Sequence, residues 1–332
     1  MQLSRMLATS ALALGVSAFA ASANTELRLA TMAPPQTPWM DLLESWADNV
    51  AENSGGELTV SIYHSGQLGN EFDTARQTQR GRIDIVNMSG SALTELVPAI
   101  ALMSTPFMFD SEEVLDCVYD GPFGDQLIEQ IEAQGFTFLQ WGETGWIYLA
   151  AQDDLTDVAN AEGYRVRVAP HPISRLVWNS VGAQGVEVHF AEAPAALQTG
   201  MIRGSEAAGL SMLGFGLHQS APHIHELRHN HQAGAMLLSD RTAARLSDEE
   251  LQILRDSLLP IEEVRQGVRA VVDGAMAQYA DAGGPFHQLT DEQRAAWADM
   301  ITPNWPDFVA DLDETAQGMW DDLLAARDAC GG

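Results

Sequence analysis

Short apolar segments that alternate with amphipathic ones constrain the fold of this chain more than any other feature of its sequence. Three strands are expected early in the chain, at residues 27–32, 58–63 and 83–88. The segment 39–50 has apolar residues at helical spacing, and a second helix is expected at 70–80. Strands that alternate with helices predict a parallel sheet, and ligands of such sheets bind beyond the carboxyl ends of the strands. The loops after Met32, Tyr63 and Met88 are therefore the first candidates for a binding site.

The rest of the chain adds a second group of strands and a helical end. These strands are expected at residues 146–150, 164–168 and 186–190. Ser247-Asp248-Glu249-Glu250 predicts a capping box before a long helix at 251–279, with bends expected at Pro260 and Gly267. A last helical stretch is expected at 305–327. Because no internal repeat or linker-like segment divides the chain, we expect two α/β lobes that the chain crosses several times.

The charge of the chain argues against several classes of function. The sequence has 17 basic and 46 acidic residues, a formal net charge of −29, and every basic residue is an arginine. A chain without lysine has neither a Schiff-base lysine nor a lysine-bearing phosphate loop. Its acidic balance also argues against binding to nucleic acid or to an anionic membrane surface.

The first 23 residues are expected to be a cleaved signal peptide. Arg5 supplies a positive charge, residues 6–20 are small and apolar, and Ala21-Ser22-Ala23 fits a cleavage site. The apolar segment is too short to span a bilayer, and no later stretch is long enough to do so. The mature chain is therefore expected in a bacterial periplasm and not embedded in the membrane.

The sequence contains two cysteines, Cys117 and Cys330. An oxidising compartment favours a disulfide between them. A bridge also requires that the two residues lie close together, which a sequence does not reveal. A disulfide and two separate thiols are both open at this point.

Arg167 stands out in a chain that has no GxSxG, HExxH or CxxC motif and no GxGxxG after a strand. Strand alternation puts Arg165 and Arg167 on the same face of a short strand. A guanidinium on a central strand needs an anion, and its planar fork matches a carboxylate. On the residues alone, a salt bridge to a nearby acid is favoured over a bound ligand.

A group of histidines is the other conspicuous feature. The members His223, His225, His229 and His231 all have odd numbers, so one continuous strand would place them on one face. Such a face would suit zinc or copper. A hydrated surface segment with a turn that breaks the register is the preferred interpretation, because closed sites of four histidines are unusual.

Trp146 is singled out among the eight tryptophans. It follows Gly142-Glu143-Thr144-Gly145, at the start of an expected strand. There its ring either faces a cleft or packs as an ordinary core aromatic, and both alternatives are open.

Several segments, taken together in their order and spacing, resemble the solute-binding proteins of tripartite ATP-independent periplasmic (TRAP) transporters, the DctP-type family. The resemblance runs from about Leu27 to Asp256. It is carried by the segments 33–39 (APPQTPW), 63–71 (YHSGQLGNE), 106–109 (PFMF), 163–168 (GYRVRV), 190–192 (FAE), 196–200 (ALQTG) and 204–206 (GSE).

The resemblance implies a fold of the α/β class, a two-lobed periplasmic-binding-protein-like architecture with a cleft between the lobes and a long helix crossing them. Such a receptor closes over a small organic acid. The lobes are expected to comprise residues 24–146 with about 233–275, and residues 147–232 with about 276–332.

The resemblance also assigns ligand-binding positions. The family's carboxylate-clamping arginine falls on Arg167, and the aromatic residue that packs on the ligand falls on Phe190. Glu71 is expected at the cleft and Glu206 at another pocket position. The remaining expected pocket residues are Met32, Ser89, Trp146 and Ala207.

The chain departs from the family's sugar-acid binders at three places. They carry a second arginine where this chain has Trp146-Ile147, a polar residue at Ala207, and an aspartate at Arg203. A polyhydroxylated sugar acid is therefore disfavoured, and a smaller or more apolar monocarboxylate is expected. Some relatives in the family bind a keto acid together with a metal ion, and Glu206 occupies a matching acidic position. The remaining ligands of that metal are not evident in this sequence. We expect neither a metal nor a cofactor.

The sequence thus predicts a periplasmic receptor that captures a small organic acid and delivers it to a TRAP membrane permease. It is expected to be a monomer rather than a dimer, and not an enzyme. One alternative is a secreted hydrolase that uses Glu71 and Glu206 as an acid–base pair. Another is a histidine-rich periplasmic metal-binding protein.

Overall fold

A computed structural model of the protein describes residues 24–168 and 172–332. The expected signal peptide, residues 1–23, lies outside the described residues. The strands are β1 (Thr25–Thr31), β2 (Leu58–Tyr63), β3 (Ile85–Met88), β4 (Phe136–Ala151), β5 (Arg165–Val168), β6 (Gln184–Glu187), β7 (Gly204–Ala208), β8 (His223–Glu226), β9 (His231–Ser239) and β10 (Phe286–Gln288).

Helices account for most of the remaining chain. They are α1 (Pro38–Asn53), α2 (Glu71–Gln79), α3 (Gly90–Leu96), α4 (Glu112–Tyr119), α5 (Pro122–Glu132), α6 (Pro172–Ser180), α7 (Ala193–Gln198), α8 (Gly209–Gly214), α9 (Asp240–Ala243), α10 (Asp248–Asp256), α11 (Ile261–Asp281), α12 (Asp291–Ile301), α13 (Trp305–Ala310), α14 (Glu314–Gly318) and α15 (Trp320–Ala329). Within the described ranges, none of these helices has the length and apolarity needed to cross a bilayer.

The long strand β4 joins two halves of one continuous sheet. The strand order is β2-β1-β3-β9-β4-β7-β5-β6, and β8 pairs with both β4 and β10. The first part of β4, up to Trp146, pairs with β9, whereas Ile147–Ala151 pairs with β7. We call the half that holds β1, β2, β3 and β9 lobe I, and the half that holds β5–β8 and β10 lobe II.

Each lobe contains the parallel strands that the alternating pattern predicts. In lobe I, β1 pairs in parallel with β2 and β3, and in lobe II, β5 pairs in parallel with β6 and β7. The sheet as a whole is mixed, because β9 is antiparallel to both β3 and β4, and β4 is antiparallel to β7. The carboxyl ends of β1, β2 and β3 still lie at one edge, so the loops that follow them are brought together.

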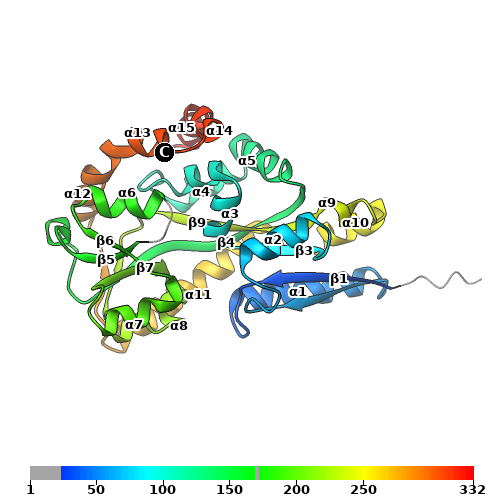
Figure 1. The fold of residues 1–332 in the computed structure, drawn as a ribbon, viewed down its shortest axis with the longest axis horizontal. Coiled ribbons are helices and arrows are strands. Elements are labelled where there is room, and N and C mark those ends of the chain that lie inside the picture. Colours follow the sequence, from blue (N-terminus) through cyan, green and yellow to red (C-terminus); the bar gives the residue numbers. More distant parts are fainter. Residues whose placement is uncertain (1–23, 169–171) are drawn as a thin grey trace, which may run out of the picture.

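The chain crosses between the lobes more than once (Figure 1). It crosses within β4, again between β8 and β9, and along α11, which contacts α1 in lobe I and both α8 and β10 in lobe II. The helix expected at 251–279 is broken at residues 257–260, and Pro260 caps the start of α11. Helix α11 continues through Gly267 without a break. This is the predicted two-lobed α/β fold with a long helix that crosses both lobes.

Helix α1 illustrates how local sequence produces these elements. The Thr37 side chain accepts a hydrogen bond from the Met40 backbone N–H. Pro38 occupies the first turn, where a backbone N–H would have no partner within the helix, so the N–H that proline lacks is not needed. Its apolar face packs on β1 through Trp46, beside the buried Leu27 and Leu29. The predicted capping box is also present at the start of α10, where Ser247 and Glu250 exchange hydrogen bonds.

The C-terminal helices are fastened to the middle of the chain. Helix α15 packs against α4 and α5, and Cys330, which follows α15, forms a disulfide with Cys117 of α4. Their Cα atoms lie 5.9 Å apart, across 213 positions of sequence. Figure 1 shows α13, α14 and α15 along one side of the molecule, beyond α4 and α5.

We expect the double substitution Cys117→Ser and Cys330→Ser to lower the free energy of unfolding by about 2–4 kcal/mol, because the bridge restricts the unfolded chain. Urea unfolding of both proteins without reductant measures the difference. Reductant should destabilise the natural chain but not the double variant. Two reactive thiols in the denatured, unreduced natural chain would contradict the bridge.

Candidate ligand-binding site

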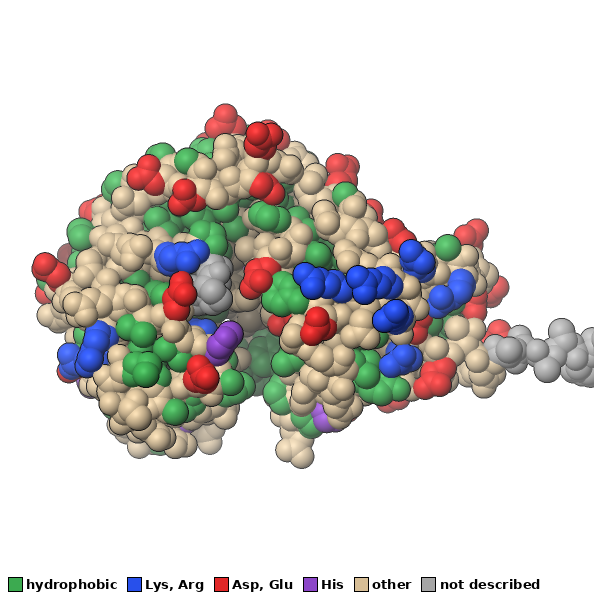
Figure 2. Space-filling view, in the orientation of Figure 1, with side chains coloured by type: hydrophobic (Ala, Val, Ile, Leu, Met, Phe, Trp, Pro, Cys, Tyr) green, Lys and Arg blue, Asp and Glu red, His purple; other side chains and the backbone are tan. Residues whose placement is uncertain are grey.

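The two lobes face each other across a notch. Figure 2 shows this notch between the half that carries α7 and α8 and the half that carries β1 and α1. On lobe I, the loops after β1, β2 and β3 converge on a small hollow, as the strand pattern predicts. It is lined by residues 30–32, Tyr63, Gly66, Leu68, Gly69, Glu71, Thr74 and Asn87. Met32, one of the expected pocket residues, keeps 44% of its surface exposed here.

Glu71 and Ser89, both expected at the cleft, are in direct contact. Glu71 is the first residue of α2, and Ser89 caps the start of α3. The Ser89 backbone N–H donates to Glu71 Oε1 at 2.6 Å, and the Ser89 hydroxyl donates to Oε2 at 2.9 Å. Burial raises the pKa of Glu71, although both hydrogen bonds from Ser89 act in the opposite direction. The result is an acidic group whose orientation is fixed on the wall of lobe I.

Arg167 lies within lobe II, on β5 between β6 and β7. Only 6% of its surface is exposed. Its Nε donates to the Val188 carbonyl at 2.8 Å, and its guanidinium carbon lies 5.2 Å from the centre of the Phe190 ring. Burial lowers the pKa of Arg167, and nearby Glu206 acts in the opposite direction. Within residues 24–168 and 172–332, no carboxylate lies within ion-pair distance of this guanidinium.

Phe190 extends the surface around Arg167. It begins a short 3-10 turn after β6, and its ring meets Phe215 edge to face at 4.9 Å between centroids. Phe215 follows α8 and keeps 46% of its surface exposed. Sequence reasoning missed Phe215, because its only local signal is the pair of flanking glycines. Phe190 therefore covers one side of the buried guanidinium, and Phe215 extends this apolar surface.

Glu206, on β7, is held by two partners that the sequence did not indicate. Its Oε2 accepts a hydrogen bond from Trp178 Nε1 at 3.1 Å and lies 3.3 Å from His229 Nε2. Both Glu206 and the neighbouring Ala207, two of the expected pocket residues, are buried on β7. Among the described residues, His229 Nδ1 and Asn230 Oδ1 are buried without a hydrogen-bond partner. These two atoms can therefore form further hydrogen bonds near Glu206.

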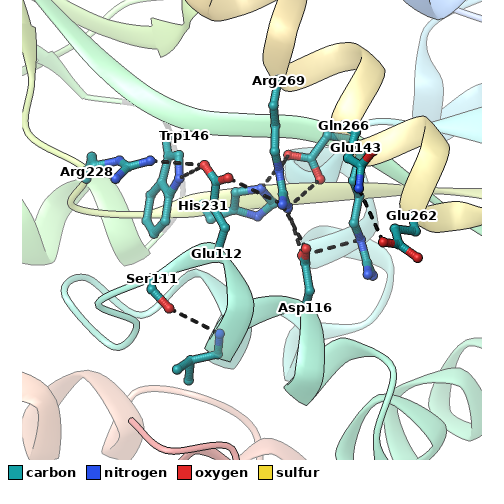
Figure 3. Close-up of polar contacts among 12 residues, drawn as sticks. Ser111, Glu112, Asp116, Glu143, Trp146, Arg228, His231, Glu262, Gln266 and Arg269 are labelled. Carbon is teal, nitrogen blue, oxygen red and sulfur yellow. Dashed lines mark hydrogen bonds and ion pairs between the residues drawn. The ribbon is translucent and has the colours of Figure 1, made fainter.

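Trp146 belongs to a different group of contacts, at the junction of β4, β9, α4 and α11 (Figure 3). Its Nε1 donates to Glu112 Oε1 at 3.0 Å, the Arg228 guanidinium covers its face at 5.3 Å, and His231 meets it edge-on. Trp146 therefore contacts a network of charged residues around Glu143. None of the described contacts of Trp146 is with Arg167 or Phe190.

That network is a buried set of charges. Arg269, on α11, donates to both oxygens of Asp116 at 2.7 Å and to Glu143 Oε1 at 3.2 Å. His231 Nε2 lies 2.7 Å from Glu143 Oε1, and the Glu143 side chain is 2% exposed. Burial raises the pKa of Glu143, but His231 and Arg269 outweigh it, so this pKa lies below its usual value. The network ties the crossing helix α11 to α4, β4 and β9.

The four histidines do not share one face, and the expected hydrated surface segment is wrong, because His225, His229 and His231 are buried. A turn with Arg228 at φ +48° separates β8 from β9, so His229 approaches Glu206 and His231 approaches Glu143. His223 and His225 instead lie beside His287 of β10, with ring planes within 9–20° of one another. Asp154, His225 and His287 have possible metal-ligand atoms within 4.8 Å. However, His225 Nε2 accepts the Leu155 N–H at 2.9 Å, and nearly parallel rings do not aim their lone pairs at one point. This arrangement is therefore not a preformed metal site.

Comparisons with known proteins agree with this fold. Residues 29–311 match the DctP family, described as bacterial extracellular solute-binding protein, family 7. The C4-dicarboxylate-binding periplasmic protein DctP of Rhodobacter capsulatus is 24% identical over 304 residues, which cover 91% of each chain.

Solved structures of TRAP periplasmic solute-binding proteins share the fold. The protein from Ochrobactrum anthropi, whose C-terminus occupies its ligand-binding pocket, has a TM-score of 0.84 at 24% identity and covers 93% of this chain and 96% of its own. The protein from Chromohalobacter salexigens, with bound D-glucuronate, has a TM-score of 0.82 at 24% identity, with coverage of 90% and 99%. Since the family match spans most of the sequence, the chain belongs to the DctP family of bacterial extracellular solute-binding proteins, which serve TRAP transporters as receptors and not as catalysts.

Proposed function

We propose that this receptor binds the carboxylate of a small organic acid through Arg167. The observation that carries the proposal is the buried guanidinium, for which no described carboxylate is within ion-pair distance. A buried charge without a direct ion pair is costly, and a bound carboxylate offsets that cost with two parallel hydrogen bonds. The Val188 carbonyl and the Phe190 ring fix the guanidinium plane before the ligand arrives.

The surroundings of Arg167 favour a ligand that is small and largely apolar beyond its carboxylate. Phe190 and Phe215 offer aromatic surface on lobe II, and Met32 offers apolar surface on lobe I. A second carboxylate that reached lobe I would meet the oriented acid Glu71. These features support the monocarboxylate that the sequence predicts. Two of the relatives are a protein with bound D-glucuronate and a C4-dicarboxylate-binding protein, which supports the general class of organic acids.

The proposed receptor works by closure of its lobes. The division into residues 24–146 with about 233–275, and 147–232 with about 276–332, is supported for the sheet by the separate strand sets on either side of β4. The C-terminal helix α15 instead packs against α4 and α5 of the first group and is bonded to α4 through Cys330 and Cys117. Ligand contacts from both lobes would favour the closed arrangement. We propose that residues 1–23 direct export to the periplasm, and that the closed monomer delivers its acid to a TRAP membrane permease.

A thermal-shift screen with paired ligands tests this function. We expect one or more small monocarboxylic acids to raise the melting temperature by several degrees when present at about a hundredfold excess over Kd. The primary amide of the same acid should produce little or no shift, because it cannot form the charged pair with Arg167.

Two outcomes of the screen would overturn the proposal. Equal shifts with an acid and its amide would remove the carboxylate from recognition. Steady release of a product in the same incubations would instead favour a hydrolase that uses Glu71 and Glu206.

A further inference from the structure

Six arginines form one face of lobe I, here called the arginine face. Figure 2 shows basic side chains gathered over the half of the molecule that holds β1, β3 and α2. The members are Arg28, Arg76, Arg80, Arg82, Arg241 and Arg245. All except the half-buried Arg28 are exposed. They are more than a third of the 17 arginines of the sequence, in a chain whose net charge is −29.

The contacts of these residues show that the face is continuous. Arg76 and Arg80 are one helical turn apart on α2 and at its end. Arg28 Nη1 donates to the Arg82 carbonyl at 3.0 Å. The Arg241 side chain packs beside Gly81, where an added Cβ would lie 3.0 Å from Arg241 Cβ. Arg245, near Arg241 on the next helical turn, pairs with Asp84 at 3.0 Å.

The positive charge of the arginine face is largely uncompensated. Within the described ranges of the chain, Arg245 alone among the six has a carboxylate within ion-pair distance. Its partner Asp84 is buried and also accepts the Arg28 backbone N–H. An arginine-rich surface with a single acidic partner among the described residues attracts an external anion.

We infer that the arginine face binds the anionic phospholipid headgroups of a membrane surface. Phosphates match the fork of arginine. The exposed large apolar side chains of the described residues are Met32, Met201, Phe215, Val271 and Met300, and none lies on α2, α9 or the turn before β3. The face therefore has no apolar centre of the kind that anchors a stable protein–protein interface. A surface of this composition suits a fluid layer of headgroups.

The net charge of the chain does not prevent this contact. Screening in physiological salt limits charge interactions to about 8 Å, so distant acidic residues act weakly on a membrane that touches the arginine face. Each arginine held at an anionic surface contributes roughly fivefold to affinity. The overall composition of the chain argues against binding to an anionic membrane. The clustering of six arginines nevertheless makes this one face positive. The contact would hold a receptor near the membrane without requiring the organic-acid site.

Sedimentation with lipid vesicles tests the inference. We expect the natural chain to bind vesicles of equal phosphatidylglycerol and phosphatidylcholine at physiological salt, where the distant acidic residues are screened, and to leave them at high salt. Vesicles of phosphatidylcholine alone should not bind. The triple variant Arg80→Gln, Arg82→Gln and Arg241→Gln should lose about a hundredfold in affinity, because three of the contributions are removed.

A matched control removes the same charge elsewhere. The triple variant Arg165→Gln, Arg175→Gln and Arg203→Gln changes exposed or half-exposed arginines of lobe II, and its affinity for the vesicles should stay within about threefold of that of the natural chain.

The inference is overturned if the natural chain does not bind the anionic vesicles, or if both triple variants lose affinity for them equally. Permease-dependent uptake that is lost in the lobe I variant, without any vesicle binding by the natural chain, would assign the face to a protein partner instead. Ligand-induced thermal shifts on the same variants separate these outcomes from a failure of the organic-acid site.

Discussion

The Arg167→Ala variant is expected to lose most of its affinity for the organic acid, by about 30-fold to several thousand-fold. Removal of one partner from a buried, hydrogen-bonded charge pair costs roughly 2–5 kcal/mol. Arg167→Lys keeps the positive charge but cannot donate two parallel hydrogen bonds to one carboxylate, so it should also weaken binding substantially. Calorimetric titration with the acid found in the thermal-shift screen measures both losses.

A neighbouring arginine provides the control for this prediction. Arg165 lies on the same strand but is exposed, so Arg165→Ala removes the same charge without entering the site. Its affinity should stay close to that of the natural chain. If Arg167 had only a structural role, Arg167→Ala would lower the melting temperature and leave the affinity of the folded fraction intact. That result would remove Arg167 from the site and most of the proposed function with it.

Much of the fold could be predicted because short-range patterns determine its elements. The apolar segments at 27–32 and 58–63 are strands, and the helix expected at 39–50 forms with a proline in its first turn and a threonine cap. The strand β9 and the first half of β4 were missed. Their place in the sheet depends on antiparallel pairing between segments about a hundred positions apart, such as Phe138 with Leu237, which local periodicity does not encode.

Part of the candidate site could likewise be predicted from the sequence, and part could not. Glu71 and Ser89 follow neighbouring parallel strands, so the rule for carboxyl ends already places them near each other, and the structure joins them by two hydrogen bonds. The contacts of Glu206 with Trp178 and His229 join three separate elements. The local sequence of these segments does not identify their partners. The preferred interpretation of the histidines included a turn, which lies at Arg228, but it placed them on a hydrated surface, whereas His225, His229 and His231 are buried.

The buried network around Glu143 is the least predictable part of the molecule, because its members are hydrophilic residues on elements far apart in sequence. Removal of its central acid should have a large effect on stability. Glu143→Gln leaves Arg269 and His231 in place but removes the negative charge that they face. We expect the free energy of unfolding at pH 7 to fall by about 3–5 kcal/mol, the usual cost of breaking a buried ion pair.

The pH dependence of the loss distinguishes the charge from the shape of the side chain. The pKa of Glu143 is lower in the folded protein than its ordinary value of 4.5. Its charge therefore stabilises the fold fully above that ordinary value, and the contribution disappears as pH falls through the folded pKa. The stability curves of the natural chain and Glu143→Gln should converge in acid. Glu263→Gln removes an exposed acid from α11, the helix that carries Arg269, and should change stability by less than about 0.5 kcal/mol. Urea unfolding from pH 7 to pH 3 measures all three proteins, and a constant difference across that range would show that lost packing, not lost charge, destabilises the variant.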